Sequence, residues 1–70
     1  MNGLMDNILE IAILEMGRQK GDQVFSCEEV VQWLYPQDWR HFTTEILDTA
    51  KSLNENGKII LSETGEIKVL

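Results

Sequence analysis

The stretch DWRHFTTEILDTAKSLNENGKIILSETGEIKVL, residues 38–70, decides the fold, because a helical pattern, a stop and a hairpin pattern follow one another in it. Its first half carries apolar residues at intervals of three and four, the spacing that gives a helix one buried face. These residues are Phe42, Ile46, Leu47, Ala50 and Leu53. We expect this helix to begin between Trp39 and Thr43, with Asp38 as its cap. Asn56-Gly57 should end it, since glycine adopts a left-handed conformation without penalty.

The end of this stretch has the alternation of a β-hairpin. Ile59 and Leu61 alternate with neighbours on the opposite face, and Ile67 and Val69 do the same on the return strand. Between them, the segment Glu63-Thr64-Gly65-Glu66 supplies the turn. The sequence therefore predicts a helix followed directly by a hairpin.

A second, shorter helix is predicted just before this stretch. Ser26 and Glu29 form an S-x-x-E capping box, in which the hydroxyl and the carboxylate each bind a free backbone N–H of the first turn. Apolar residues then recur at helical spacing, namely Cys27, Val30, Val31 and Leu34. Pro36 should end the helix at or before Tyr35. Trp33 points about 110° away from the apolar face, either folded over a neighbouring helix or exposed as an anchor for a partner.

The N-terminal part predicts a longer helix, from about Leu4 to Gln19, whose apolar residues occupy roughly 260° of its circumference. They are Leu4, Met5, Ile8, Leu9, Ile11, Ala12, Ile13, Leu14 and Met16. Either this helix is central to a small core, or Ile13 or Leu14 lies on a surface that meets a second copy or another protein. The polar segment RQKGDQ, which follows Gly17 and contains Gly21, ends the helix. Gln23 to Phe25 should then form a short strand.

This order of elements predicts an α+β fold, a small winged helix-turn-helix of three helices, a short strand and a C-terminal β-hairpin, in one domain over residues 1–70. In that fold the third helix usually reads the major groove of DNA and the hairpin is the wing.

From Cys27 to Ile59 the chain resembles a bacterial winged-helix family catalogued as domain of unknown function 3253. The matching residues are Glu29-Val30 with Leu34, Trp39-Arg40, Ile46, Ala50, Leu53 and Gly57-Lys58-Ile59. The resemblance implies a winged helix with no established activity. The chain departs from the family at Cys27-Glu28, where Pro and Ser are usual, and at Leu47, where an Arg is usual. The last departure removes a positive charge from the third helix.

Composition and charge narrow the classes of function. Hydrophobic residues make up 43% of the chain and charged residues 26%, ordinary for a soluble domain, and no apolar run is long enough to span a membrane. Six Lys and Arg against twelve Asp and Glu give a net charge of −6, which disfavours the phosphates of nucleic acid. Cys27 is the only cysteine, and the N-terminus does not have the pattern of a secretory signal, so we expect a cytoplasmic protein.

No residue pattern predicts catalysis, a cofactor or a metal. His41 is the only histidine, and Cys27 and the carboxylates lie at no spacing typical of zinc ligands. Cys27 begins a helix, where the dipole could lower the pKa of its thiol, but its place on the apolar face favours a buried structural role. Ser26 is explained by capping. We therefore expect a protein that is not an enzyme.

Charge also weakens the prediction of DNA binding. Between Asp38 and Asn56 four acidic residues oppose two basic ones, and Glu63 and Glu66 lie at the wing tip. A DNA-binding surface would have to use a small set of cationic and hydroxyl side chains: Arg40, Thr44, Lys51, Ser52, Lys58 and Lys68.

The sequence favours a non-catalytic module that binds another protein or its own copy. The candidate partner-binding residues are Ile13, Leu14, Trp33 and Arg40. Arg40 either pairs with a carboxylate such as Asp38 or Glu28, beside a Trp39 that closes the core, or anchors an acidic or aromatic partner segment. The alternative is a DNA-binding transcriptional regulator.

Overall fold

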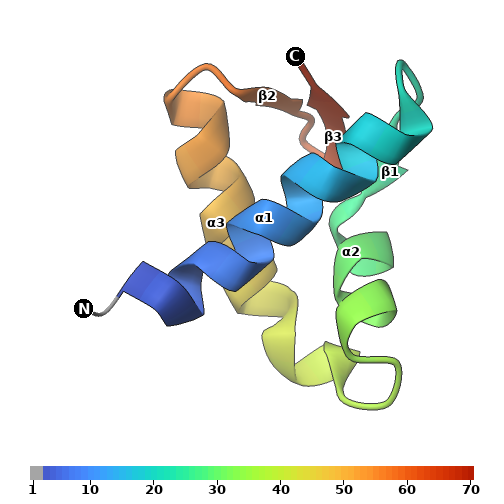
Figure 1. Ribbon diagram of the computed structural model, residues 1–70, viewed down its shortest axis with the longest axis vertical. Coiled ribbons are helices and arrows are strands. Elements are labelled where there is room, and N and C mark those ends of the chain that lie inside the picture. Colours follow the sequence, from blue (N-terminus) through green and yellow to red (C-terminus); the bar gives the residue numbers. More distant parts are fainter. Residues whose placement is uncertain (1–2) are drawn as a thin grey trace.

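The computed structural model describes the backbone of residues 3–70 and the side chains of residues 8–70. Its elements follow in the order α1 (Gly3–Lys20), β1 (Phe25–Ser26), α2 (Cys27–Leu34), a 3-10 helix η1 (Trp39–Phe42), α3 (Thr43–Glu55), β2 (Ile59–Leu61) and β3 (Glu66–Val69). The strands form one antiparallel sheet in the order β1-β3-β2. In Figure 1, α1 crosses the front of the molecule, with α3 to its left, α2 to its right and the strands at the top. The predicted α+β fold of three helices, a short strand and a C-terminal hairpin is confirmed.

The core lies between the helices and one face of the sheet. Every α-helix and every strand contributes buried side chains, and the largest of those that are fully buried are Phe25, Ile13, Ile46, Ile59, Ile67, Val30 and Val31. In the hairpin, Ile59 and Ile67 point into the core while Ile60 and Lys68 point away from it. Full burial of such an aliphatic or aromatic side chain stabilises the fold by about 1.5–3 kcal/mol.

The capping box at the start of α2 is confirmed. The backbone N–H of Glu29 donates to Ser26 Oγ at 3.1 Å, and the backbone N–H of Ser26 donates to Glu29 Oε1 at 2.9 Å. The helix ends at Leu34, as expected from Pro36. In the following connector, the rings of Tyr35 and Phe42 stack with centroids 4.2 Å apart, which ties the end of α2 to the start of α3.

The third helix differs from the prediction at its start and agrees at its end. Asp38 makes no side-chain capping hydrogen bond, because η1 precedes the α-helical turns and the chain enters α3 through Phe42 instead. At the other end, Gly57 has φ +77°, and the N–H of Lys58 donates to Leu53 O at 3.0 Å. With the bond from Gly57 N to Asn54 O, this is a Schellman motif.

The hairpin turn begins one residue earlier than predicted. The N–H of Gly65 donates to Ser62 O at 3.1 Å, and the N–H of Ser62 donates to Glu66 O at 2.9 Å. Gly65 has φ +86°, so the connection is a type I turn followed by a glycine bulge. Gly65 O also accepts from Cys27 N at 3.0 Å, which joins the turn to the start of α2.

Candidate functional site

The outer surface of α1 is the first candidate site, and here the prediction needs a correction. Ile13 has no exposed surface and belongs to the core, and Leu14 is partly buried against the core. The prediction that Ile13 meets a partner is therefore wrong. The exposed apolar residues of this helix are Ile8 and Ile11, at 48% and 63% exposure. Leu4 and Met5 fall outside the residues whose side chains are described.

The helical angles explain which apolar residues of α1 are buried and which are exposed. Leu9, Ala12 and Ile13 lie within about 100° of one another on the core side, whereas Ile8 and Ile11 lie on the edge that faces away. An apolar arc of roughly 260° contains both sets, so periodicity alone does not tell which part is covered. The sequence therefore did not identify Ile8 and Ile11 as the exposed apolar residues.

Trp33 lines a shallow depression between α1 and α2. The depression has a volume of about 550 Å³, and its walls are Met16, Gln19, Lys20, Glu29, Gln32 and Trp33. Trp33 is 48% exposed, as its angle to the apolar face of α2 suggested. Lys20 Nζ lies 3.6 Å from Glu29 Oε2, so a charged pair from the two helices borders the depression. A half-exposed tryptophan with a polar rim has the composition of a hot spot for protein binding.

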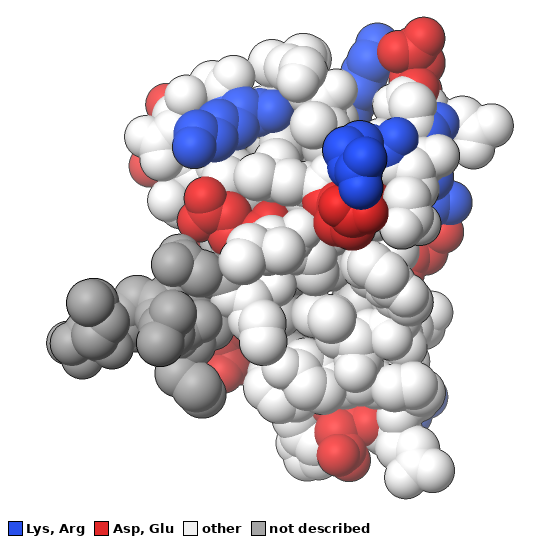
Figure 2. Space-filling view, in the orientation of Figure 1, with Lys and Arg blue, Asp and Glu red and all other residues white. Residues whose placement is uncertain are grey.

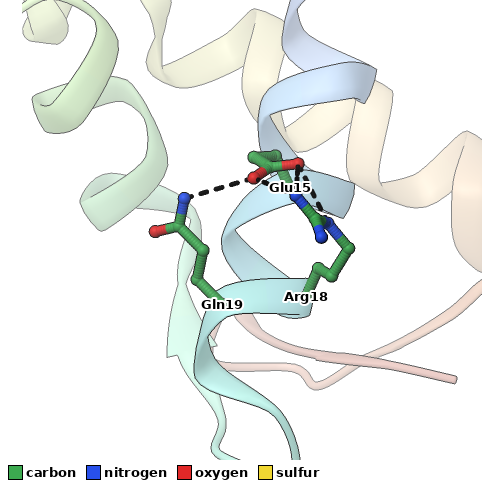
Figure 3. Close-up of polar contacts among 3 residues, drawn as sticks. All are labelled: Glu15, Arg18 and Gln19. Carbon is green, nitrogen blue, oxygen red and sulfur yellow. Dashed lines mark hydrogen bonds and ion pairs between the residues drawn. The ribbon is translucent and has the colours of Figure 1, made fainter.

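A polar cluster on α1 lies next to this depression (Figure 3). Arg18 donates to both carboxylate oxygens of Glu15, with Nη2 2.8 Å from Oε2, and Gln19 Nε2 donates to Glu15 Oε2 at 3.2 Å. The hydrogen bonds from Arg18, and secondarily from Gln19, hold the pKa of the Glu15 carboxyl below its ordinary value. Gln19 belongs to both features, so the cluster fixes one wall of the depression.

The residues proposed for DNA contact are divided among η1, α3 and the hairpin. Thr44, Lys51 and Ser52 lie within about 100° of one another on the outer side of α3, where Asp48 and Glu55 lie among them. Lys58 and Lys68 are on the hairpin instead, on the outer face of the sheet. On the face in Figure 2, Lys and Arg are scattered in the upper half with acidic side chains beside them, and the lower half is mostly uncharged.

Within residues 8–70, Arg40 does not form the ion pair that the first of its two expected roles requires. Its guanidinium carbon lies 4.6 Å from the centroid of the Trp39 ring, a cation–π contact with its own neighbour in η1. Among the described side chains it forms no ion pair with Asp38 or Glu28. Trp39 packs against the core from the connector, as predicted. Arg40 remains exposed and keeps its donors free for a partner.

A smaller groove separates the start of α2, the first half of α3 and the hairpin turn. It measures about 270 Å³ and is lined by Ser26, Cys27, Glu28, Thr43, Ile46, Leu47, Thr64 and Gly65. Leu47, which the helical pattern assigned to the buried face, is 38% exposed here, so that assignment is wrong. Cys27 is buried, and burial raises the pKa of its thiol, which agrees with a structural role rather than a reactive one.

No protein-family model matches the chain, and comparisons with curated proteins and with solved structures found no match. None of the helices in residues 3–70 has the length and apolar character needed to cross a membrane. Within the described residues, His, Cys, Asp and Glu side chains do not gather in any group of three or more that could hold a metal ion.

Proposed function

We propose that this domain is a non-catalytic, winged-helix binding module that associates with another protein or with a second copy of itself. The observation that carries the proposal is the half-exposed Trp33 at the depression between α1 and α2. Large aromatic residues that are left exposed at the edge of a pocket are the usual centres of protein interfaces. A cytoplasmic location and membership of the bacterial family named above are part of the same proposal.

A second group of exposed apolar residues lies further toward the start of α1. Ile8 and Ile11 are only partly buried, since 48% and 63% of their surfaces face solvent. Covering them with a partner would remove that apolar area from water at about 25 cal/mol per Å² before the costs of association are subtracted. They would supply a second apolar contact on α1, separate from the Trp33 depression.

DNA binding is the second candidate, supported by the order of elements. Against it stand the net charge of −6 and the acidic residues that border Lys51 on α3. A duplex-binding protein needs several phosphate contacts, and each one lost lowers affinity steeply at physiological salt. We therefore place this reading behind protein binding.

Sedimentation equilibrium tests the self-association form of the proposal. We expect the weight-average mass of the wild-type chain to rise between about 10 µM and 1 mM, the range of a weak interface. Trp33→Ala and Ile11→Asp should hold the mass at that of the monomer. Ile60→Asp is the matched control, because Ile60 is 52% exposed but lies on the sheet. A wild-type chain that stays monomeric throughout would remove the homodimer version.

A further inference from the structure

The outer face of the sheet is a second surface, distinct from α1 and Trp33. Because side chains alternate along a strand, residues next to the buried ones point away from the core. The apolar side chains exposed in this way are Val24, Ile60 and Leu70, at 51%, 52% and 69% exposure. Two lysines, Lys58 and Lys68, lie among them.

The strand register brings these five residues together. Ile60 is opposite Lys68, and the N–H of Leu70 donates to Lys58 O at 3.1 Å, so Lys58 is opposite Leu70. On the other side of β3, Phe25 pairs with Ile67, so Val24, the residue just before β1, lies toward Lys68. The stem of Lys68 therefore lies between two apolar side chains, and Lys58 is its diagonal neighbour about 7–8 Å away.

The charge of this face is opposite to that of the whole chain. Within residues 8–70, Arg18 and Lys20 are paired with carboxylates, whereas Lys58 and Lys68 have no carboxylate within 4.0 Å. Glu66, two residues before Lys68 on the same side of β3, marks the acidic limit of the face. The surface is thus apolar and basic on a domain of charge −6.

On each edge of the sheet, one outward backbone N–H is already bonded to a side chain. In β2, the outward N–H of Leu61 donates to Asn54 Oδ1 at 3.3 Å. In β1, the outward N–H of Ser26 donates to Glu29 Oε1 at 2.9 Å. Strand addition uses such edge groups, so these two bonds oppose it and favour a partner that covers the face instead.

We propose that the outer face of the sheet binds an acidic amphipathic helix of another protein. Apolar residues of that helix would cover Val24, Ile60 and Leu70, while its carboxylates would pair with Lys58 and Lys68. A helix is the element that normally covers a free sheet face, and it can present apolar and acidic side chains together. A second copy in a symmetric pairing is disfavoured, because it would bring the lysines of both copies together. This inference goes beyond the α1 surface and does not depend on self-association.

The test uses the full chain and two designed helical peptides of about 18 residues, long enough to be helical in water. Both peptides carry Leu at helical spacing; one has Glu on its polar face and the other has Lys. We expect the acidic peptide to shift the backbone amides of Val24, Ile60 and Lys68, with an affinity that falls as salt is added. The basic peptide should leave these amides unchanged.

Charge-reversal variants complete the test. Lys58→Glu combined with Lys68→Glu should weaken the acidic peptide about tenfold, from the loss of two exposed pairs and the new repulsion. Arg40→Glu combined with Lys51→Glu makes the same change in net charge on η1 and α3, and should weaken it less than threefold. Equal weakening by both pairs, or no amide shift on the sheet at millimolar peptide, would overturn the proposal. So would a DNA duplex that shifts the Lys58 and Lys68 amides when the acidic peptide does not.

Discussion

The close approach of α1 to β3 gives the sharpest prediction about the fold. Gly17 is buried inside α1, and a Cβ atom added there would lie 2.7 Å from Val69 Cβ and closer still to Val69 Cγ2. Carbon atoms in contact prefer about 3.5–4.0 Å, so Gly17→Ala has to push the helix and strand apart by about 1 Å. Rotation of Val69 moves its methyl groups but leaves its Cβ in place.

The change in the free energy of unfolding follows from two opposing effects. Overpacking of this kind costs about 3 kcal/mol when backbone has to move, and alanine gains about 1 kcal/mol over glycine within a helix. We therefore expect Gly17→Ala to lower the free energy of unfolding by about 2 kcal/mol, a large part of the roughly 4–10 kcal/mol of a domain this size. The melting temperature should fall by about 10 °C.

Urea unfolding followed by tryptophan fluorescence measures this change. Ser52→Ala is the control, since Ser52 is exposed on α3 and the substitution alters only helix propensity. In the background of Val69→Ala, the cost of Gly17→Ala should shrink, because one of the clashing groups is gone. A Gly17→Ala chain that is about 1 kcal/mol more stable than wild type would refute the close approach, since helix propensity alone predicts that result.

Three further predictions concern single groups. Ser26→Ala should cost about 1 kcal/mol in urea unfolding, because α2 loses its cap; a loss below about 0.3 kcal/mol would contradict the capping role. Arg18 lowers the pKa of the Glu15 carboxyl, so any stability from the pair is present at neutral pH and is lost as the pH falls through the folded-state pKa. In an NMR titration, Arg18→Gln should raise the pKa of Glu15. An unchanged pKa would contradict the pairing. Burial and the raised pKa of Cys27 should make its thiol react slowly with a thiol reagent at neutral pH in the folded chain and rapidly in urea; equal rates would show that it is accessible.

The elements that were predictable from the sequence are those with a local chemical signature. The capping box of Ser26 and Glu29, the stop at Pro36 and the left-handed Gly57 each act over three or four residues. The alternation of Ile67 and Val69 with Glu66 and Lys68 likewise indicates which side of the hairpin is buried. These signals are enough to set the order of elements, and from that order the fold class follows.

The parts that the sequence could not give depend on how the elements pack. α1 is apolar over so much of its circumference that its own pattern does not separate buried Ile13 from exposed Ile11. Leu47 fits the helical spacing of α3 but lines a groove between α3, the start of α2 and the hairpin turn, which leaves it partly exposed. The contact of Gly17 with Val69 joins residues far apart in the chain, and no local pattern indicates it.

The candidate sites likewise differ in whether one element or the packing of several elements defines them. Trp33 was identified because its angle on α2 departs from the apolar face, which is a property of one helix. The basic and apolar face of the sheet depends on the register of three strands, in which Val24 and Ile60 flank Lys68 from two different neighbours. A surface built from separate strands becomes visible only when their pairing is known.

We propose that this domain binds protein through apolar surfaces rather than DNA through α3 and the hairpin. A titration of the backbone amides with a random-sequence DNA duplex at low salt tests it most directly, because low salt favours any phosphate contact. We expect the amides of η1, α3 and the turn at Gly65 not to shift. Shifts in Thr44, Lys51 and the turn that disappear as salt is added would contradict it.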